Sequence, residues 1–185
     1  EQSSRKARSR GRIRKALKVG ARERVVMYVS SNYDLNYRYL SYRNHSDNDY
    51  FRQQVRILRF LCSLHNLRVV LKLHPSFGSP LPSWIQRSLP EEVTVRSARG
   101  AFGSMIHLAD AVVMDTPATS LVQVLQGSAR VYVYNTCYHW EPGILEVLQR
   151  TCCVSDDFDS WAQSFRRDIA SGRAFEPRLD DPELI

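Results

Sequence analysis

The sequence has little of what a membrane-spanning or disulfide-stapled protein needs. Its 185 residues include only four cysteines, without CxxC spacing or a paired Cys/His framework: Cys62, Cys137, Cys152 and Cys153. That pattern argues against a zinc ribbon or a disulfide scaffold and favours a reducing compartment. Near the N-terminus only Ile13, Leu17 and Val19 offer apolar anchorage, too little for a membrane span or a secretory signal. We therefore expect a soluble, cytoplasmic protein.

Several short catalytic motifs are also missing. The chain contains no GxxxxGK[ST], GxGxxG, HExxH or GxSxG pattern. These absences argue against a P-loop hydrolase, a dinucleotide-dependent dehydrogenase, a zinc peptidase and an α/β-hydrolase. We expect neither a bound metal nor a cofactor.

The basic residues are concentrated at the N-terminus. The formal net charge is +7, yet residues 1–24 contain ten Lys or Arg and two Glu, which gives this stretch +8. The remaining chain has 16 basic and 17 acidic groups and carries −1. Clustered cations can bind polyanions, but we favour a solvated linker, with the anionic inner face of the membrane as the alternative partner and nucleic acid disfavoured. We predict a basic linker or disordered tail over 1–23, one folded domain over 24–175 and a C-terminal tail over 176–185.

Strand-like and helix-like segments alternate along the rest of the chain. Short β-rich runs cover 24–29, 67–73, 93–95, 111–114 and 131–134, with a Cys-Cys-Val strand fragment at 152–154. Helical patterns cover 48–65, 101–108, 118–126 and 144–150. The run at 67–73 is almost entirely apolar, which suits a strand buried on both faces. The alternation predicts an α/β fold: a parallel, Rossmann-like sheet flanked by helices.

A final helix carries an aromatic stripe. Phe158, Trp161, Phe165 and Ile169 recur at helical spacing, and Gly172 marks the end of the helix. We predict that the stripe packs into the core, in preference to contacting a ligand.

Two basic side chains lie at the end of the second predicted strand. His74 precedes Pro75, which favours extended geometry, so its imidazole is expected to project from the sheet edge. There it could donate to a phosphate or exchange protons near neutral pH; a loop histidine bonded to the backbone is the alternative. Lys72, two residues earlier, is a cation within an apolar strand. It either binds phosphate or extends its ammonium to solvent.

Hydroxyl and carboxylate groups follow the fourth predicted strand. Asp115 could accept a hydrogen bond from a sugar hydroxyl, or it could cap the next helix. Thr116 fits the N-cap position, and Thr119 and Ser120 add hydroxyls in the first turn. Unpaired N–H groups at a helix start favour an anion, typically a phosphate. Weaker candidates are Ser30, Ser31, His139 and Glu141.

These segments, in this order, resemble a known family. Val-Met-Tyr-Val-Ser-Ser at 26–31, Lys-Leu-His-Pro at 72–75 and Ala-Asp-Ala-Val-Val-Met-Asp-Thr-Pro-Ala-Thr-Ser at 109–120 are similar to the nucleotide-binding half of bacterial surface-polysaccharide transferases. These are GT-B enzymes such as the CDP-glycerol glycerophosphotransferases. The chain differs in carrying Thr-Pro-Ala-Thr-Ser where that family usually shows a Tyr-Ser-Ser cluster.

The resemblance implies roles for particular residues. Six residues would face the nucleotide diphosphate: His74, Pro75, Asp115, Thr116, Thr119 and Ser120. Lys72 would bind the phosphates beside them. His74 would be the catalytic residue, and it would neutralise charge on the leaving diphosphate together with Lys72.

The resulting hypothesis is a donor-binding lobe over 24–175, one lobe of a GT-B architecture. It would belong to a metal-independent glycosyltransferase or glycerophosphotransferase of surface-polysaccharide synthesis, with a nucleotide sugar or CDP-polyol as donor. The N-terminal acceptor lobe is missing from this chain, so the lobe alone is expected to be inactive. The alternatives are a sugar-nucleotide epimerase of the same architecture and a non-catalytic nucleotide- or nucleic-acid-binding module.

Overall fold

A computed structural model describes residues 11–12, 14–20, 23–30, 47–73, 93–96, 102–116, 119–135 and 140–176. Its centre is a six-stranded sheet with the order β3-β2-β1-β4-β5-β6. The strands are β1 (Arg24–Val29), β2 (Leu67–Lys72), β3 (Val93–Arg96), β4 (Ala111–Met114), β5 (Arg130–Tyr134) and β6 (Cys152–Ser155). Every neighbouring pair is parallel. The predicted Rossmann-like α/β fold is therefore confirmed.

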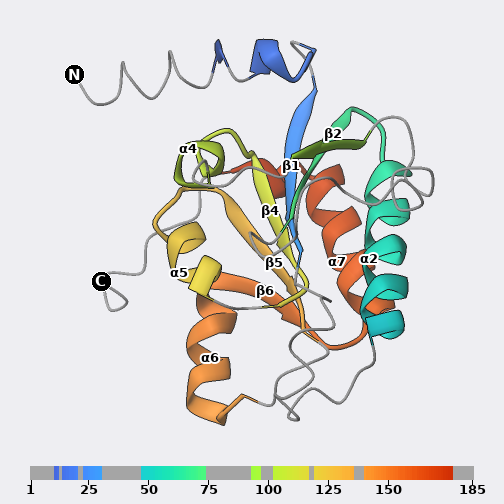
Figure 1. Cartoon of the computed structure of the whole chain (residues 1–185). Helices are drawn as coiled ribbons and strands as arrows, with labels where there is room; N and C mark the ends of the chain where they lie inside the picture. The colour runs from blue at the N-terminus through green and yellow to red at the C-terminus, as the bar shows by residue number, and fades with distance from the viewer. Residues whose placement is uncertain are drawn as a thin grey trace.

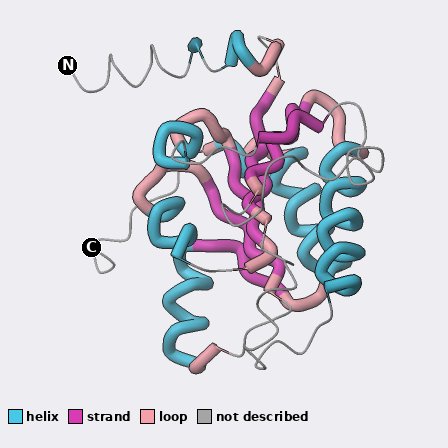
Figure 2. Tube along the Cα trace, in the orientation of Figure 1, coloured by secondary structure: helices cyan, strands magenta, loops and turns pink. Residues whose placement is uncertain are grey.

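Helices lie on both faces of this sheet (Figures 1 and 2). They are α2 (Asp47–Cys62), α4 (Phe102–Ile106), α5 (Thr119–Leu125), α6 (Pro142–Thr151) and α7 (Phe158–Ala170). Side chains alternate along each strand, so Val26 and Tyr28 of β1 face α2 and α7, whereas Val25 and Met27 join the core that includes α4 and α5. Burial on both faces explains why the strands are continuous apolar runs.

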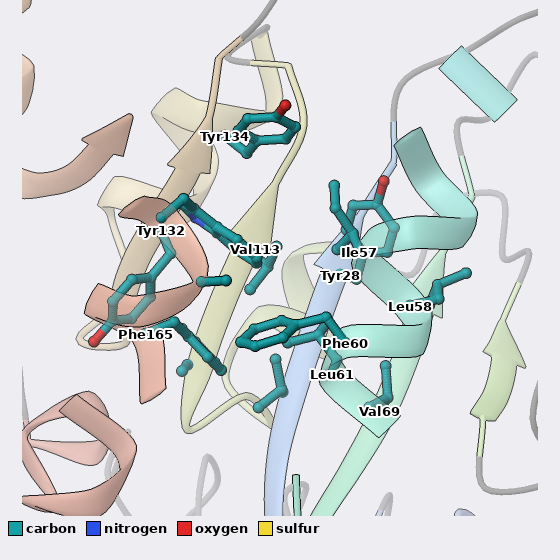
Figure 3. Packing of buried hydrophobic residues seen from close by; sticks show 14 of the residues in the cluster. Tyr28, Ile57, Leu58, Phe60, Leu61, Val69, Val113, Tyr132, Tyr134 and Phe165 are labelled. Carbon is teal, nitrogen blue, oxygen red and sulfur yellow. The ribbon is translucent and has the colours of Figure 1, made fainter. Parts of the chain in front are cut away.

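The core beneath α2 and α7 is rich in aromatic rings. Trp161 and Phe165 of α7 stack with centroids 5.8 Å apart, and Phe60 of α2 meets Trp161 edge-on at 5.5 Å. Tyr132 of β5 meets Phe165 at 4.7 Å. Figure 3 shows how residues of α2, of the strands and of α7, among them Phe60, Tyr132 and Phe165, pack together in this cluster. The prediction that the stripe on the last helix packs into the core is confirmed.

Helix ends differ from the sequence expectation where local turns intervene. The second helix was expected over 48–65, but α2 ends at Cys62, and the chain then tightens into a turn in which Leu64 N bonds to the carbonyl oxygen of Leu61 at 3.2 Å. Asn66 then adopts a left-handed φ of 61°, which turns the chain into β2. At α7 the side chain of Asp157 accepts a hydrogen bond of 2.8 Å from Ser160 N and caps the first turn.

The segment just before β1 packs against the domain. Leu17 is buried in the core that contains α4 and α5. Arg14 donates to the carbonyl oxygens of Gly20 at 3.1 Å and Glu23 at 2.7 Å, and it lies 3.6 Å from Asp110. The expected linker over 1–23 therefore includes residues in contact with the core, while its first ten lie outside the described residues.

At the other end, a 3-10 helix, η2 (Arg173–Phe175), buries Ala174 against α7. Glu176 follows it and ion-pairs with Arg130 of β5 at 3.7 Å. The rest of the expected C-terminal tail lies outside the described residues. No helix in the described ranges has the length and apolar character to cross a bilayer.

Candidate functional site at the carboxyl edge of the sheet

The sheet changes its direction of growth between β1 and β4. The chain first builds outward from β1 through β2 to β3, and it then returns to the other side of β1 with β4, β5 and β6. In open α/β sheets, ligands bind beside the carboxyl ends of the strands at such a switch point. A ligand site is therefore expected at the edge where β1 and β4 end.

Buried polar residues gather at that edge. Among the described residues, seven polar or charged ones are buried, and five of these end a strand or lie one or two residues beyond its carboxyl end: Ser30, Lys72, Asp115, Thr116 and Asn135. Val29 is in register with both Lys72 and Met114, so Ser30 and Asp115 leave their strands at the same level. Burial of polar groups is costly without partners. Their gathering at the switch point marks a candidate site.

Ser30 and Lys72 join the ends of β1 and β2. The backbone N–H of Ser30 donates to the carbonyl oxygen of Lys72 at 3.1 Å, and its hydroxyl lies 3.5 Å from the same oxygen. Lys72 is 4% exposed, and its ammonium donates to the carbonyl oxygen of Leu73 at 3.0 Å. Burial lowers the pKa of Lys72. Its ammonium also lies 5.9 Å from the ring centroid of Phe102, on the α4 side of the sheet.

Asp115 lies on the face of the sheet that α2 and α7 cover, opposite the face that carries the ammonium of Lys72. Its side chain is fully buried, and its Oδ2 accepts a hydrogen bond of 2.5 Å from the hydroxyl of Tyr28. This buried contact joins the ends of β1 and β4. Asp115 therefore has a structural partner within the fold, whatever else it binds.

Thr116 has an unsatisfied group. The residue is 7% exposed, and its Oγ1 is buried without a hydrogen-bond partner among the residues that the structure describes. A buried hydroxyl without a partner costs about 1–3 kcal/mol, so a ligand atom that bonds to it would gain correspondingly. Thr119 is exposed and Ser120 half-buried at the start of α5.

Most of the other predicted site residues are not among those that the structure describes. His74, Pro75, Ser31 and His139 lie outside the described residues. Glu141 is exposed before α6, and its side chain makes no capping hydrogen bond. No group of three or more His, Cys, Asp or Glu side chains suited to a metal occurs within the described ranges.

Two residues of this edge were missed by the sequence interpretation. Tyr28 was read only as part of a strand, although a phenol next to a strand end can reach beyond it. Asn135 directly follows β5, is buried, and its backbone N–H donates to the carbonyl oxygen of Ser155 at 2.8 Å. Asn135 shares the sequence feature that identified Asp115: it is a polar residue directly after an apolar strand.

No protein-family model matches the sequence, and no curated protein matches it. A solved structure that is similar is that of the glycosyltransferase SnogD from Streptomyces nogalater, with a TM-score of 0.49 and 14% sequence identity. The similarity covers 85% of this chain and 40% of the SnogD chain. The chain thus spans less than half the length of that glycosyltransferase.

Proposed function

We propose that the carboxyl edge between β1 and β4 binds the diphosphate of a nucleotide-activated sugar or polyol. The observation that carries the proposal is the set of buried polar groups at the switch point, above all the hydroxyl of Thr116 without a partner. A phosphate oxygen accepts hydrogen bonds and would satisfy this donor. The second support is the resemblance of residues 26–31, 72–75 and 109–120 to surface-polysaccharide transferases.

The residues at this edge would bind the diphosphate in different ways. The ammonium of Lys72 supplies the positive charge that stabilises the leaving diphosphate. Thr119 and Ser120 donate hydroxyl hydrogen bonds to the same group, and Asp115 positions the end of β4 through its contact with Tyr28. His74 faces the same diphosphate and neutralises its charge together with Lys72, as the resemblance implies.

The whole enzyme would be a transferase of surface-polysaccharide synthesis, and this chain its donor-binding lobe. A second lobe binds the acceptor in the proposed architecture. The isolated chain would therefore bind donor without turning it over. A CDP-polyol and a nucleotide sugar share the diphosphate that this edge is proposed to hold.

The proposal is tested by ligand-dependent thermal stability. CDP, UDP, GDP and ADP are each compared with the parent nucleoside, because a ligand that binds only the folded state raises the melting temperature. We expect at least one diphosphate to stabilise the chain more than its nucleoside. Equal shifts for both, or none with any diphosphate, would remove the diphosphate site from this edge.

Matched variants locate the site. Thr116→Val keeps the volume but removes the hydroxyl, and it should weaken diphosphate binding by about 1–3 kcal/mol, whereas Thr116→Ser should retain it. Lys72→Met should weaken the same binding, and Lys15→Met, at an exposed lysine, should not. In the full-length enzyme, His74→Ala should abolish transfer while costing less than about 1 kcal/mol of stability.

A further inference from the structure

A second polar pocket lies at the opposite edge of the sheet. It has a volume of about 330 Å³ and lies at the amino ends of β5 and β6. The last residues of α6, the end of α7 and η2 form the rest of its wall. Figure 1 shows β6 with α6 and α7 beside it. The pocket is therefore separated from the carboxyl edge by the length of the strands.

Four arginines converge on this pocket from four different elements. Arg130 comes from β5, Arg150 from α6, Arg167 from α7 and Arg173 from η2. They are thus not the solvated face of one helix. Guanidinium groups bind phosphate oxygens in bidentate fashion, and several of them around one cavity form a site for a phosphate.

The carboxylates nearby do not neutralise this charge. Asp168 is the acidic residue in the pocket wall, so the wall carries an excess of three positive charges. Its Oδ2 accepts a hydrogen bond of 3.0 Å from Tyr132, and its Oδ1 lies 3.8 Å from Nε of Arg167. Two more carboxylates, Glu146 and Glu176, lie 2.8 Å from Arg150 and 3.7 Å from Arg130. Both are mostly exposed, so these pairs are weak and screened by salt.

The helix dipole accounts for the positions of only two of the four arginines. Arg150 and Arg167 lie in the last turns of their helices, where the helix dipole favours a cation. Arg130 is the first residue of strand β5, and Arg173 is the first residue of the three-residue η2, so neither lies in the last turn of an α-helix. The Nε of Arg130 is buried without a hydrogen-bond partner among the described residues, and Arg173 contacts no carboxylate in the described part of the chain. A buried guanidinium N–H without an acceptor is costly, which a bound anion would relieve.

We propose that this pocket binds a small phosphate-bearing molecule, such as a phosphate monoester or pyrophosphate. The volume suits a ligand of that size. Arg130 and Arg173 contact the phosphate, while Arg150 and Arg167 add to the positive potential. This site is independent of the proposed diphosphate site at the carboxyl edge and uses none of its residues.

The test titrates the whole chain with pyrophosphate and with glycerol 3-phosphate, followed by calorimetry. The ¹⁵N signal of the Arg130 Nε–H group provides the local readout. We expect binding that weakens with salt and shifts this signal. Arg173→Gln should reduce the affinity for glycerol 3-phosphate at least tenfold, and Arg130→Gln combined with Arg173→Gln should abolish glycerol 3-phosphate binding.

A control separates this site from other basic regions. Arg59→Gln, at an exposed arginine of α2 outside the pocket, should leave the glycerol 3-phosphate affinity unchanged. Because Arg173 is exposed, its variant is expected to fold even if the double variant does not. Vesicles that contain phosphatidate test whether the phosphate belongs to a lipid headgroup. If the chain bound these vesicles through Arg173 but bound neither soluble phosphate, the proposed small-molecule site would be wrong. The proposal also fails if neither phosphate binds, or if Arg59→Gln reduces binding as much as Arg173→Gln.

Discussion

The hydroxyl of Tyr28 and the carboxylate of Asp115 form a buried hydrogen bond of 2.5 Å at the ends of β1 and β4. The two residues are 87 positions apart in sequence, and they meet where the order of the sheet reverses. The contact fixes the relative position of the two strand ends from which Ser30 and Thr116 follow. A ligand at the switch point would therefore meet an edge that is organised in advance.

Removing this hydroxyl tests the contact. Tyr28→Phe should lower the free energy of unfolding by about 1–3 kcal/mol, since a buried carboxylate loses a donor. Urea denaturation followed by circular dichroism measures the change. Tyr134→Phe on β5 is the matched control, and it leaves the Tyr28–Asp115 pair in place. If Tyr28→Phe proved as stable as the parent chain, the hydrogen bond would contribute nothing to the fold.

The aromatic cluster should dominate the stability of the α7 face. Phe165 is fully buried and contacts the rings of Phe60, Tyr132 and Trp161. Phe165→Ala should cost about 3–5 kcal/mol, because it leaves a cavity among rings that cannot fully collapse. The midpoint of urea unfolding reports the loss. Ile144→Ala, at an exposed position of α6, should change it by less than about 0.5 kcal/mol; equal effects would contradict the assigned core.

The stability at alkaline pH should depend on Tyr132. Burial, together with the Asp168 carboxylate, raises the pKa of Tyr132 above its usual value of 10.0. The folded state then holds this proton more tightly than the unfolded state does. The resulting stability is fully present below pH 10.0 and is lost progressively as the pH rises toward the higher pKa of the folded state.

Tyr132→Phe separates the two contributions. At pH 7 it should lower the free energy of unfolding by about 1–3 kcal/mol, because Asp168 loses a buried donor. Between pH 10 and 11 the variant should lose less stability per pH unit than the parent chain, since one titrating phenol is gone. Urea titrations at a series of pH values measure both. An unchanged alkaline slope would show that this phenol does not contribute.

The segment at 14–20 should depend on Asp110 for its attachment. Asp110 lies 3.6 Å from Arg14 and 3.7 Å from Arg24, and its Oδ2 accepts a hydrogen bond of 2.7 Å from Val25 N. Asp110→Asn keeps an acceptor oxygen but removes the charge. We expect faster tryptic cleavage after Lys18, with a change in global stability below about 1 kcal/mol.

A second charge removal controls for the loss of a carboxylate. Asp159→Asn removes an exposed carboxylate 3.1 Å from Arg56, far along the chain from this segment, and should leave cleavage after Lys18 unchanged. Acceleration by both variants, or by neither, would mean that Asp110 does not hold the segment.

The strands could be read from the sequence because each is decided by its own residues. The runs at 24–29 and 111–114 were predicted with the bounds that the structure has, because apolar β-rich segments between polar turns must be buried on both faces. The same applies to the aromatic stripe of α7. Lys72, Asp115 and Thr116 could likewise be named as candidates from their positions at strand ends, and their roles toward a ligand stay predictions.

The tertiary structure alone decided which of these residues meet. The sequence of alternating elements determined a parallel α/β sheet, but the order β3-β2-β1-β4-β5-β6, and with it the contact of Tyr28 with Asp115, arises from packing between distant segments. Arg130, Arg150, Arg167 and Arg173 each look like an ordinary surface charge in the sequence, and only the fold brings them to one pocket. Local propensity follows from a residue and its neighbours along the chain, whereas a binding site depends on distances between elements that no short stretch encodes.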